Sequence, residues 1–300
     1  MVSKIELIST EILDDYPELA TELSQNAKSL GLSSGWHYVL DWTWTICQTD
    51  AVAGKTIVDA GAGIGLLQWF FARKGAHVIS IDRCDRTCIP FHLLDRFDVS
   101  GYMPGENPLN LMELLDVGNK KANLKSRAKA IVRGLMGKWS LSDDRENSTG
   151  YVKLYQADLR YLLEIPDQSI DIIVSISALE HNRNIEDIKS IVHELTRILK
   201  PGGKMVVTLP ASGRGDWFFE PAYSWCFSEK TLRELFELPE NTPSNFSDYG
   251  HIFEEIVHST ELRNSLSWRY FWSPNNGMPW GKWNPQYIPV GILKTKQVGN

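Results

Sequence analysis

The sequence predicts an α/β fold built on a mostly parallel sheet. Short β-branched segments alternate with amphipathic helical segments over residues 54–98 and again over residues 151–210. A glycine-rich turn joins the first of these strands to the first helix, and an acidic residue ends the following strand. Strand–helix–strand alternation at this spacing is typical of βαβ units, in which crossover helices connect parallel strands.

Residues 1–53 are expected to form a helical extension ahead of this core. Ile5, Leu7 and Ile8 recur at helical spacing, and the pattern continues through Ile12 and Leu13. A Gly/Ser-rich turn at 31–35 then precedes a second, aromatic helical segment at 36–48.

The core elements follow in a regular order. In chain order we expect a strand at 56–60, a helix at 66–75, strands at 77–82, 151–158 and 170–177, a helix at 185–200, a strand at 204–210, a helix at 228–238 and a last strand at 288–296. The simplest organisation is a single domain over 1–300, with 54–98 and 151–210 as its ligand-binding core.

Residues 99–150 contain no convincing strand and are expected to be a basic helical insertion or lid. Between 120 and 138 there are seven Lys or Arg residues and no acidic residue, with apolar residues at helical spacing among them. Such a helix can be a packed lid with a solvated charged face, a weak membrane-surface contact, or a clamp for an anionic substrate.

Residues 211–300 are expected to form an aromatic acceptor-side region together with the last strands. Of the eleven Trp residues in the chain, six follow residue 216. Aromatic faces with amides between them suit flat or polyhydroxylated acceptors, and they equally suit a core in a loop-rich region.

Composition narrows the function classes. The 300 residues carry 31 basic and 37 acidic side chains, a net charge of −6, and 43% are hydrophobic. These values are ordinary for a globular protein and argue against a general nucleic-acid binder, which needs a basic face. The N-terminus lacks the pattern of a secretory signal and no apolar stretch approaches the ~20 residues that cross a bilayer, so we expect a cytoplasmic protein. The four cysteines, Cys47, Cys84, Cys88 and Cys226, include no zinc-type pair, and no metal site is predicted.

The segment VDAGAGIG at 58–65 is the strongest local signal. Glycines between a strand and a helix let the backbone approach a ligand, and the helix N-terminus offers free N–H groups. A dinucleotide fold asks for G-x-G-x-x-G, but Leu66 stands where the last glycine would be. Asp59 just ahead of the glycines also disfavours a pyrophosphate and favours a positively charged ligand.

These segments resemble the ordered motifs of class I S-adenosylmethionine-dependent methyltransferases of type 11. The resemblance comprises VDAGAGIG, SID (80–82), QADL (156–159), IDIIVSISALEH (170–181), and LKPGG with VVTLP (199–210). It implies a Rossmann-like sheet of seven mostly parallel strands with helices on both faces, and S-adenosylmethionine as cofactor.

The resemblance also implies residue roles. Asp59, Gly61, Ala62 and Gly63 would line the methionine and ribose portion of the cofactor, and Gly65 would let the helix start close behind. Asp82 would hold the ribose hydroxyls, with Arg83 beside the adenine. Asp158 and the N–H of Leu159 would bind the adenine edge, and the chain at Ser175 and Ile176 would bring carbonyls to the methionine amino group. Asp158 can alternatively be an N-cap for the turn Leu159–Leu163.

Four further residues are candidates for binding the acceptor. His37 and Tyr38 lie on the aromatic helix before the core, and Arg214 and Trp217 follow the fifth core strand. His181 is the candidate catalytic base, because it follows a strand at the sheet edge where ligands bind and titrates near neutral pH. It can also be a helix-entry residue. Relatives that methylate catechol-like rings bind a metal through E-x-x-E-H, but Ser177 replaces the first glutamate here.

We therefore predict a methyltransferase that acts on a small-molecule, glycan-linked or lipid-linked acceptor, at oxygen rather than nitrogen or carbon. Three alternatives stay open: an NAD-dependent oxidoreductase on a similar sheet, an aminopropyl-type transferase, and a non-catalytic binding module. The residues do not indicate an oligomeric state.

Overall fold

A computed structural model of the chain describes residues 3–32, 34–84, 86, 89–90, 93, 96–100, 150–265 and 283–297. The predicted basic insertion therefore lies almost entirely outside the described residues, as do Cys88 and much of the aromatic tail. The chain divides into two compact units, the first made of Met1–Asp50 and Pro166–Asn300, the second of Ala51–Ile165.

The second unit is a parallel sheet of the predicted βαβ type. Its strands are β2 (Thr56–Ala60), β3 (His77–Asp82), β4 (Val99–Ser100) and β5 (Tyr151–Gln156), in the order β2-β3-β5-β4, and α4 (Leu67–Arg73) packs on β3 and β5. Four of the five residues of β2 are buried, which is the continuous apolar pattern of a parallel strand covered on both faces. The expected strands at 56–60 and 77–82 and the helix between them are confirmed, whereas Val99–Ser100, assigned to the insertion, forms a short strand.

A close backbone approach explains one glycine of this unit. Gly150 enters β5 directly over the end of α4, and a Cβ there would lie 2.2 Å from the carbonyl oxygen of Ala72 and 2.6 Å from that of Ala76. Only glycine fits this position, so it determines how closely β5 begins against the helix.

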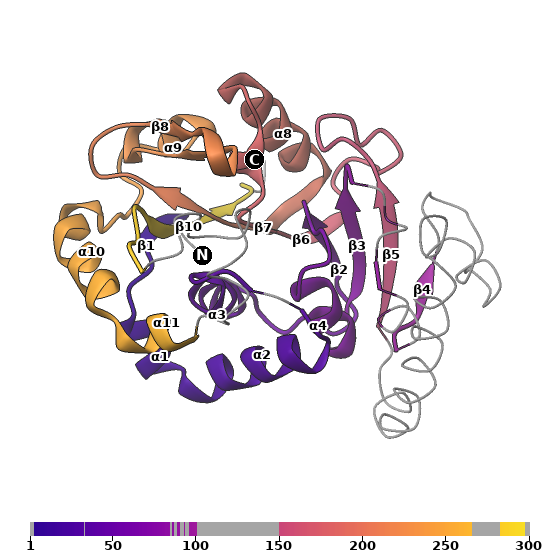
Figure 1. Ribbon diagram of the computed structural model, residues 1–300. Coiled ribbons are helices and arrows are strands. Elements are labelled where there is room, and N and C mark those ends of the chain that lie inside the picture. The colour runs from indigo at the N-terminus through magenta and orange to yellow at the C-terminus, as the bar shows by residue number, and fades with distance from the viewer. Residues whose placement is uncertain are drawn as a thin grey trace. The chain divides into compact units, whose positions relative to one another are not determined.

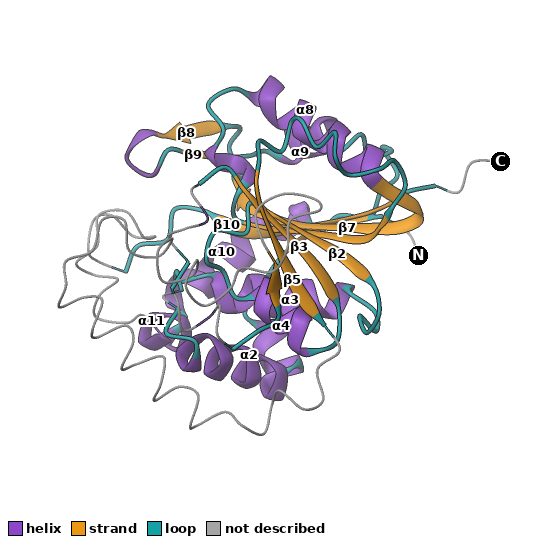
Figure 2. Cartoon of the chain, turned by 90° about the vertical axis from the view of Figure 1, so that its right-hand side faces the viewer, coloured by secondary structure: helices purple, strands orange, loops and turns teal. Residues whose placement is uncertain are grey.

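The first unit combines parallel and antiparallel strands. Its order is β1 (Lys4–Leu7), β10 (Ile288–Thr295), β7 (Leu199–Ala211) and β6 (Ile170–Ile176), with β6 and β7 parallel and the other two pairs antiparallel. Figures 1 and 2 show α3 (Tyr38–Gln48) on one face of these strands and α8 (Ile185–Ile198) on the other. The fold-class prediction, a mostly parallel α/β sheet with helices on both faces, is confirmed. Among the described residues this sheet has eight strands, four from each unit, where seven were expected.

The additional strand corrects the helical interpretation of residues 4–7. These residues form β1, which pairs with β10 in the register Lys4↔Leu293 through Leu7↔Val290. Within the strand Ile5 and Leu7 are buried while Lys4 and Glu6 are half-buried, so the side chains alternate with a period of two rather than 3.6. The rest of the extension is helical as predicted, in α1 (Glu11–Asp15), α2 (Pro17–Ser29) and α3.

The remaining elements of the first unit lie along its sheet and toward the C-terminus. They are η2 (Leu179–His181), β8 (Trp217–Phe219), η3 (Glu220–Ala222), β9 (Ser224–Cys226), α9 (Glu229–Leu235), η4 (Phe246–Asp248), α10 (Tyr249–His258) and α11 (Thr260–Ser265). Gly291 in β10 makes room for the indole of Trp44, whose ring atoms would lie 2.4 Å from a Cβ at this position. None of the helices in the described ranges is long and apolar enough to span a membrane.

Candidate functional site

The glycine loop of the second unit has the backbone that its sequence predicts. Gly61 and Gly63 adopt left-handed conformations, with φ of +75° and +47°. The N–H groups of Gly61 and Ala62 both donate to the carbonyl oxygen of Ile81, at 2.9 and 3.0 Å. The loop is thereby tied to the end of β3, and Gly65 lies just before α4, which begins at Leu67.

Asp82 lies at the carboxyl end of β3 and faces this loop. Its Oδ2 accepts a 2.8 Å hydrogen bond from the N–H of Gly63, and its Oδ1 accepts one of the same length from the N–H of Cys84. Each carboxylate oxygen has a further lone pair. A carboxylate fixed by two backbone donors at the loop edge is suited to accept hydrogen bonds from neighbouring ligand hydroxyls.

The buried Arg86 organises the underside of the loop and was missed in the sequence analysis. Its guanidinium, 1% exposed, donates to the carbonyl oxygen of Gly63 at 2.7 Å, to Ser80 Oγ at 2.5 Å and to Gln68 Oε1 at 3.2 Å. Gln68 in turn donates to the carbonyl oxygen of Gly65 at 3.0 Å. Arg86 follows Asp82 closely, as Arg83 does, and nothing in the sequence shows which of the two arginines turns inward.

Asp59 lies at the end of β2 with only 4% of its surface exposed. Burial raises the pKa of its carboxyl to about 7, and the nearby charge of Asp82 adds to the shift, while Arg86 and a hydrogen bond from the Gln68 backbone oppose it. Asp59 therefore exchanges its proton in the neutral range, and a cationic ligand would favour its ionised form.

Asp158 lies just past the end of β5. Its Oδ1 accepts from the backbone N–H of Arg160 at 3.0 Å, and its Oδ2 pairs with the Arg160 guanidinium at 2.7 Å, which lowers the pKa of the Asp158 carboxyl. The capping alternative therefore has direct support, and an adenine role stays a prediction. Leu159 is half-buried beside it, while Arg83 is exposed. The carbonyl oxygen of Asp82 accepts from the N–H of Ala157 at 3.0 Å, which joins the ends of β3 and β5.

In the first unit, the segment after β6 positions the other candidates. Ser175 is buried and Ile176 is the last residue of the strand. Ser177 then adopts a left-handed conformation, with φ of +46°, and the chain turns into η2. This turn places Glu180 and His181 beyond the carboxyl end of a parallel strand, where ligands bind in open α/β sheets.

His181 is held from one side by the β8–β9 hairpin. Its Nδ1 lies 2.9 Å from the carbonyl oxygen of Tyr223, a residue at φ +51° in the hairpin turn. Because a carbonyl only accepts, Nδ1 carries the proton, and in the neutral ring Nε2 is then the basic nitrogen. Nε2 lies 4.0 Å from Glu180 Oε1, and the imidazole is 42% exposed.

Glu180 is the buried member of this pair. Its side chain is 1% exposed, and its Oε1 accepts a 2.5 Å hydrogen bond from the hydroxyl of Ser177. Burial raises the pKa of the Glu180 carboxyl, while His181, Ser177 and His37 oppose the shift. Glu180 lies within the motif at 170–181, for which only the neighbouring His181 was predicted to be catalytic.

The two predicted acceptor residues on the aromatic helix lie at the same cluster. His37 Nδ1 pairs with Asp41 Oδ2 at 2.6 Å, and both side chains are buried. Burial raises the pKa of the Tyr38 hydroxyl, the charges of Glu180 and Asp41 add to the shift, and Ser177 hydrogen-bonds the hydroxyl. The cluster made by His37, Tyr38, Asp41, Ser177, Glu180 and His181 thus joins the first turn of α3 to η2, and we call it the Glu180 cluster.

Arg214 precedes the β8–β9 hairpin, and Trp217 is the first residue of β8. Arg214 is exposed, and its N–H donates to Ser212 Oγ at 3.3 Å. Trp217 is half-buried in β8, opposite Cys226 of β9. Cys226 is within electrostatic reach of Glu180, so the base of the hairpin lies near the Glu180 cluster.

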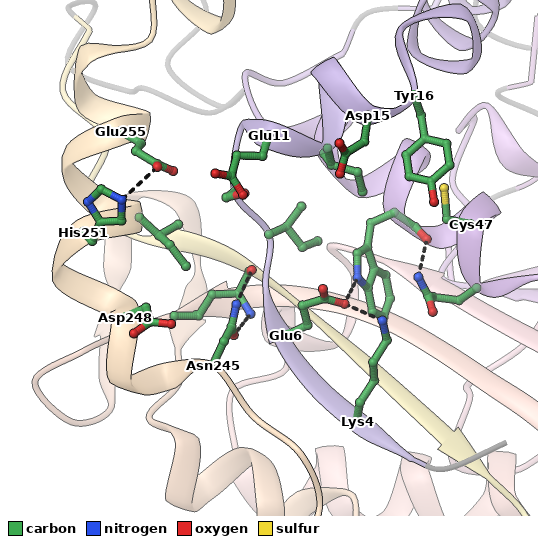
Figure 3. Close-up of a pocket in the computed structure, with 17 residues that line it drawn as sticks. Lys4, Glu6, Glu11, Asp15, Tyr16, Cys47, Asn245, Asp248, His251 and Glu255 are labelled. Carbon is green, nitrogen blue, oxygen red and sulfur yellow. Dashed lines mark hydrogen bonds and ion pairs between the residues drawn. The ribbon is translucent and has the colours of Figure 1, made fainter.

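A separate pocket of about 380 Å³ lies elsewhere in the first unit (Figure 3). It is lined from β1, α1, α3 and α10, and none of the predicted site residues is among its lining. Glu6 at its base accepts from Trp44 Nε1 at 2.6 Å and pairs with Lys4 at 2.6 Å. Across the residues that the structure describes, no three His, Cys, Asp or Glu side chains are grouped to hold a metal ion.

Residues 135–207 match the family model of the methyltransferase domain. This part of the chain is similar to a methyltransferase domain. The matched segment includes β5, β6, η2, α8 and most of β7. It therefore contains two of the motifs that resemble class I methyltransferases and most of a third, and it ends before the aromatic region. Among curated proteins, none has a sequence that matches this chain.

Solved structures similar to this chain are distant in sequence. An S-adenosylmethionine-dependent methyltransferase from Methanosarcina mazei is 14% identical over 85% of this chain and 97% of its own, with a TM-score of 0.44. The [4+2]-cyclase SpnF is 16% identical over 99% of this chain and 100% of its own, with a TM-score of 0.47. The 1,6-didemethyltoxoflavin-N1-methyltransferase from Burkholderia thailandensis is 11% identical over 96% of this chain and 85% of its own, with a TM-score of 0.42.

Proposed function

We propose that the chain transfers a methyl group from S-adenosylmethionine to an oxygen atom of a small, glycan-linked or lipid-linked acceptor. The observation that carries the proposal is the acidic edge of the glycine loop, where Asp82 is fixed by the N–H of Gly63 and Asp59 is buried beneath. Carboxylates suit a cofactor that carries ribose hydroxyls and two positive groups, and they disfavour a pyrophosphate.

The residues of the second unit fit the cofactor in their chemistry. Asp82 would accept the ribose hydroxyls, and the backbone at Gly61, Ala62 and Gly63 would approach the ligand without side chains between. Asp158 and Leu159 would bind the adenine edge, with Arg83 flanking the ring. In the first unit, the carbonyls at Ser175 and Ile176 would serve the amino group.

The chemistry asked of the protein is limited. When bound, S-adenosylmethionine supplies a methyl group on a cationic sulfur that is already activated for attack. The protein aligns the acceptor oxygen, excludes water and removes one proton. We assign proton removal to His181, because the Tyr223 carbonyl holds the proton on Nδ1 and leaves Nε2 basic.

Calorimetric titration tests the cofactor. We expect S-adenosylmethionine to bind the native protein and Asp82→Ala to lose that binding, since both carboxylate oxygens are removed. Asp98→Ala is the matched control, because Asp98 is an exposed aspartate of the same unit whose backbone, not side chain, contacts β5. Binding of NAD(H) instead would establish the oxidoreductase alternative, and preference for the decarboxylated cofactor would establish an aminopropyl-type transferase.

The other functional assignments stay predictions. If S-adenosylmethionine binds but no acceptor is methylated, the result would favour the non-catalytic binding module. We also propose a cytoplasmic location, a single-domain organisation over 1–300 and a weak membrane-surface contact through 120–138.

A further inference from the structure

In each of two buried carboxylates of the Glu180 cluster, only one of the two oxygens has a hydrogen-bond or ion-pair partner among the described residues. Asp41 and Glu180 are each 1% exposed. Asp41 Oδ2 pairs with His37 and Glu180 Oε1 accepts from Ser177. Their other oxygens, Asp41 Oδ1 and Glu180 Oε2, receive no hydrogen bond from any described residue. A buried carboxylate oxygen without a donor is costly, so such an oxygen points to a group that is bound there during function.

The charges around these two oxygens indicate which kind of ligand group would bind them. Within the described ranges, the ion-pair partners of Asp41 and Glu180 are the imidazoles of His37 and His181. Neither carboxylate is paired with a Lys or Arg there. A neutral hydroxyl would donate one hydrogen bond to these oxygens, whereas an ammonium group brings a positive charge and up to three donors.

The neighbouring side chains suit an organic cation rather than a bare ion. The His37 ring lies 5.1 Å from that of Trp36, 5.0 Å from that of Tyr38 and 5.6 Å from that of Tyr287. Aromatic rings beside carboxylates stabilise an ammonium group and pack against the carbon body that carries it.

We propose that Asp41 and Glu180 bind a protonated amine of the acceptor, so that the substrates of this protein are amine-bearing molecules. The proposal rests on the proposed function in treating the bound molecule as the methyl acceptor. The amine is the recognition element, and the methylated oxygen is another group of the same molecule.

A matched pair of probes tests the site without a known acceptor. Benzylamine and benzyl alcohol have nearly the same shape and differ in the ammonium group. Titration followed by ligand-detected NMR should show saturable binding of benzylamine to the native protein and about tenfold or more weaker binding of benzyl alcohol, the difference expected for hydrogen bonds to charged groups.

Variants locate the binding. Glu180→Gln and, independently, Asp41→Asn should each weaken benzylamine binding by about tenfold or more. Glu255→Gln is the matched control, because Glu255 on α10 also has a buried oxygen with no described partner but lies outside the cluster. Circular dichroism checks that each variant is folded, and two independent variants keep the test decisive if one is not.

Absence of benzylamine binding, equal binding of benzyl alcohol, or an equal loss in Glu255→Gln would each overturn the amine site. Titration of S-adenosylmethionine into the same preparations separates this outcome from the proposed function. Benzylamine binding without cofactor binding would leave the amine site standing and the methyl transfer rejected, and the converse would reject only the amine site.

Discussion

The guanidinium of Arg86 donates a 2.7 Å hydrogen bond to the carbonyl oxygen of Gly63, so a buried cation holds the glycine loop from beneath. The N–H of the same glycine donates to Asp82 on the ligand side. Gly63 is therefore fixed at both its carbonyl and its amide, and a loop that must pack a ligand against bare backbone is preorganised by side chains of its own unit.

Replacement of Arg86 should show this role directly. Arg86→Met keeps the aliphatic volume but removes the donors to Gly63, Ser80 and Gln68 and the charge opposite Asp59. We expect the free energy of unfolding to fall by about 3 kcal/mol, as when one partner of a buried ionic network is removed. Urea denaturation measures it. Arg83→Met, at an exposed arginine nearby, should stay within about 0.5 kcal/mol of the native protein. Equal losses in the two variants would show that Arg86 has no special role.

Gly63→Ala, compared with a control glycine, should distinguish the loss of stability caused by backbone strain from the loss of cofactor affinity caused by a ligand contact. At φ +47° a side chain costs about 1 kcal/mol of stability, and the added Cβ would lie 3.9 Å from Asp82 Oδ2. Gly54→Ala is the control, because Gly54 has φ +72° with no atom within 4 Å of a Cβ. Both variants should lose similar stability in urea denaturation, but only Gly63→Ala should weaken S-adenosylmethionine binding in calorimetry. Unchanged affinity in Gly63→Ala would argue that the ligand does not contact this part of the loop.

The pKa of about 7 for Asp59 predicts that the free energy of unfolding falls with rising pH, whereas the affinity for the cofactor rises. Between about pH 4 and pH 7 the unfolded chain has lost this proton while the folded chain keeps it. The free energy of unfolding should therefore fall as pH rises through this window, by up to about 4 kcal/mol from this group, and level off above it. Urea denaturation across the window should show this slope, and Asp59→Asn should remove this contribution.

Cofactor binding should respond in the other direction. A cationic ligand favours the ionised form of Asp59, so affinity should rise with pH and be about tenfold lower at pH 6 than at pH 8. Calorimetry at both pH values measures the ratio, and Asp59→Asn should be weaker and pH-independent over this range. A native affinity that does not change with pH would mean that Asp59 is not close to positive charge on the ligand.

Sequence patterns predicted the regular elements well where one period dominated. The strand at 56–60, the helix after the glycine loop and the last strand all have an unmistakable apolar pattern, and each is confirmed. Residues 4–7 were misassigned because Ile5, Leu7 and Ile8 satisfy both a helical and a strand period. Only pairing with β10, nearly the whole chain away, decides between them.

The site was harder to predict because its decisive features are long-range. Arg83 and Arg86 are equivalent in the sequence, but one is exposed and the other is buried under the loop. Asp41 and Glu180 lie on elements separated by more than a hundred residues, and nothing in either segment shows that both are left with an unsatisfied oxygen. Burial and hydrogen-bond satisfaction are properties of the packed chain, so local patterns do not reveal them.

The edge strand β1 is bonded by the backbone of Pro243, which accepts from the N–H of Ile5 at 2.9 Å, and by the side chain of Asn245. Asn245 Oδ1 accepts from the N–H of Leu7 at 2.7 Å, and Asn245 Nδ2 donates to the Leu7 carbonyl oxygen at 3.1 Å, so the amide closes the edge as a further strand would. Asn245→Ala should lower the free energy of unfolding by about 1–3 kcal/mol in urea denaturation. Asn245→Asp keeps the acceptor and should lose less, while a neutral result for Asn245→Ala would show that water replaces the amide fully.

The contact between His181 and Tyr223 predicts an unusual tautomer. Because the Tyr223 carbonyl oxygen lies 2.9 Å from Nδ1, the neutral ring should carry its proton on Nδ1 rather than on Nε2, the form that predominates for free histidine. Two-bond ¹H–¹⁵N correlation spectra above neutral pH distinguish the two tautomers by the ¹⁵N shifts. His251, whose Nε2 pairs with Glu255 on an exposed helix, is an internal comparison expected to keep its proton on Nε2. If His181 instead carries its proton on Nε2, it has no basic nitrogen on the side facing Glu180, and proton removal from the acceptor has to be assigned to another residue of the Glu180 cluster.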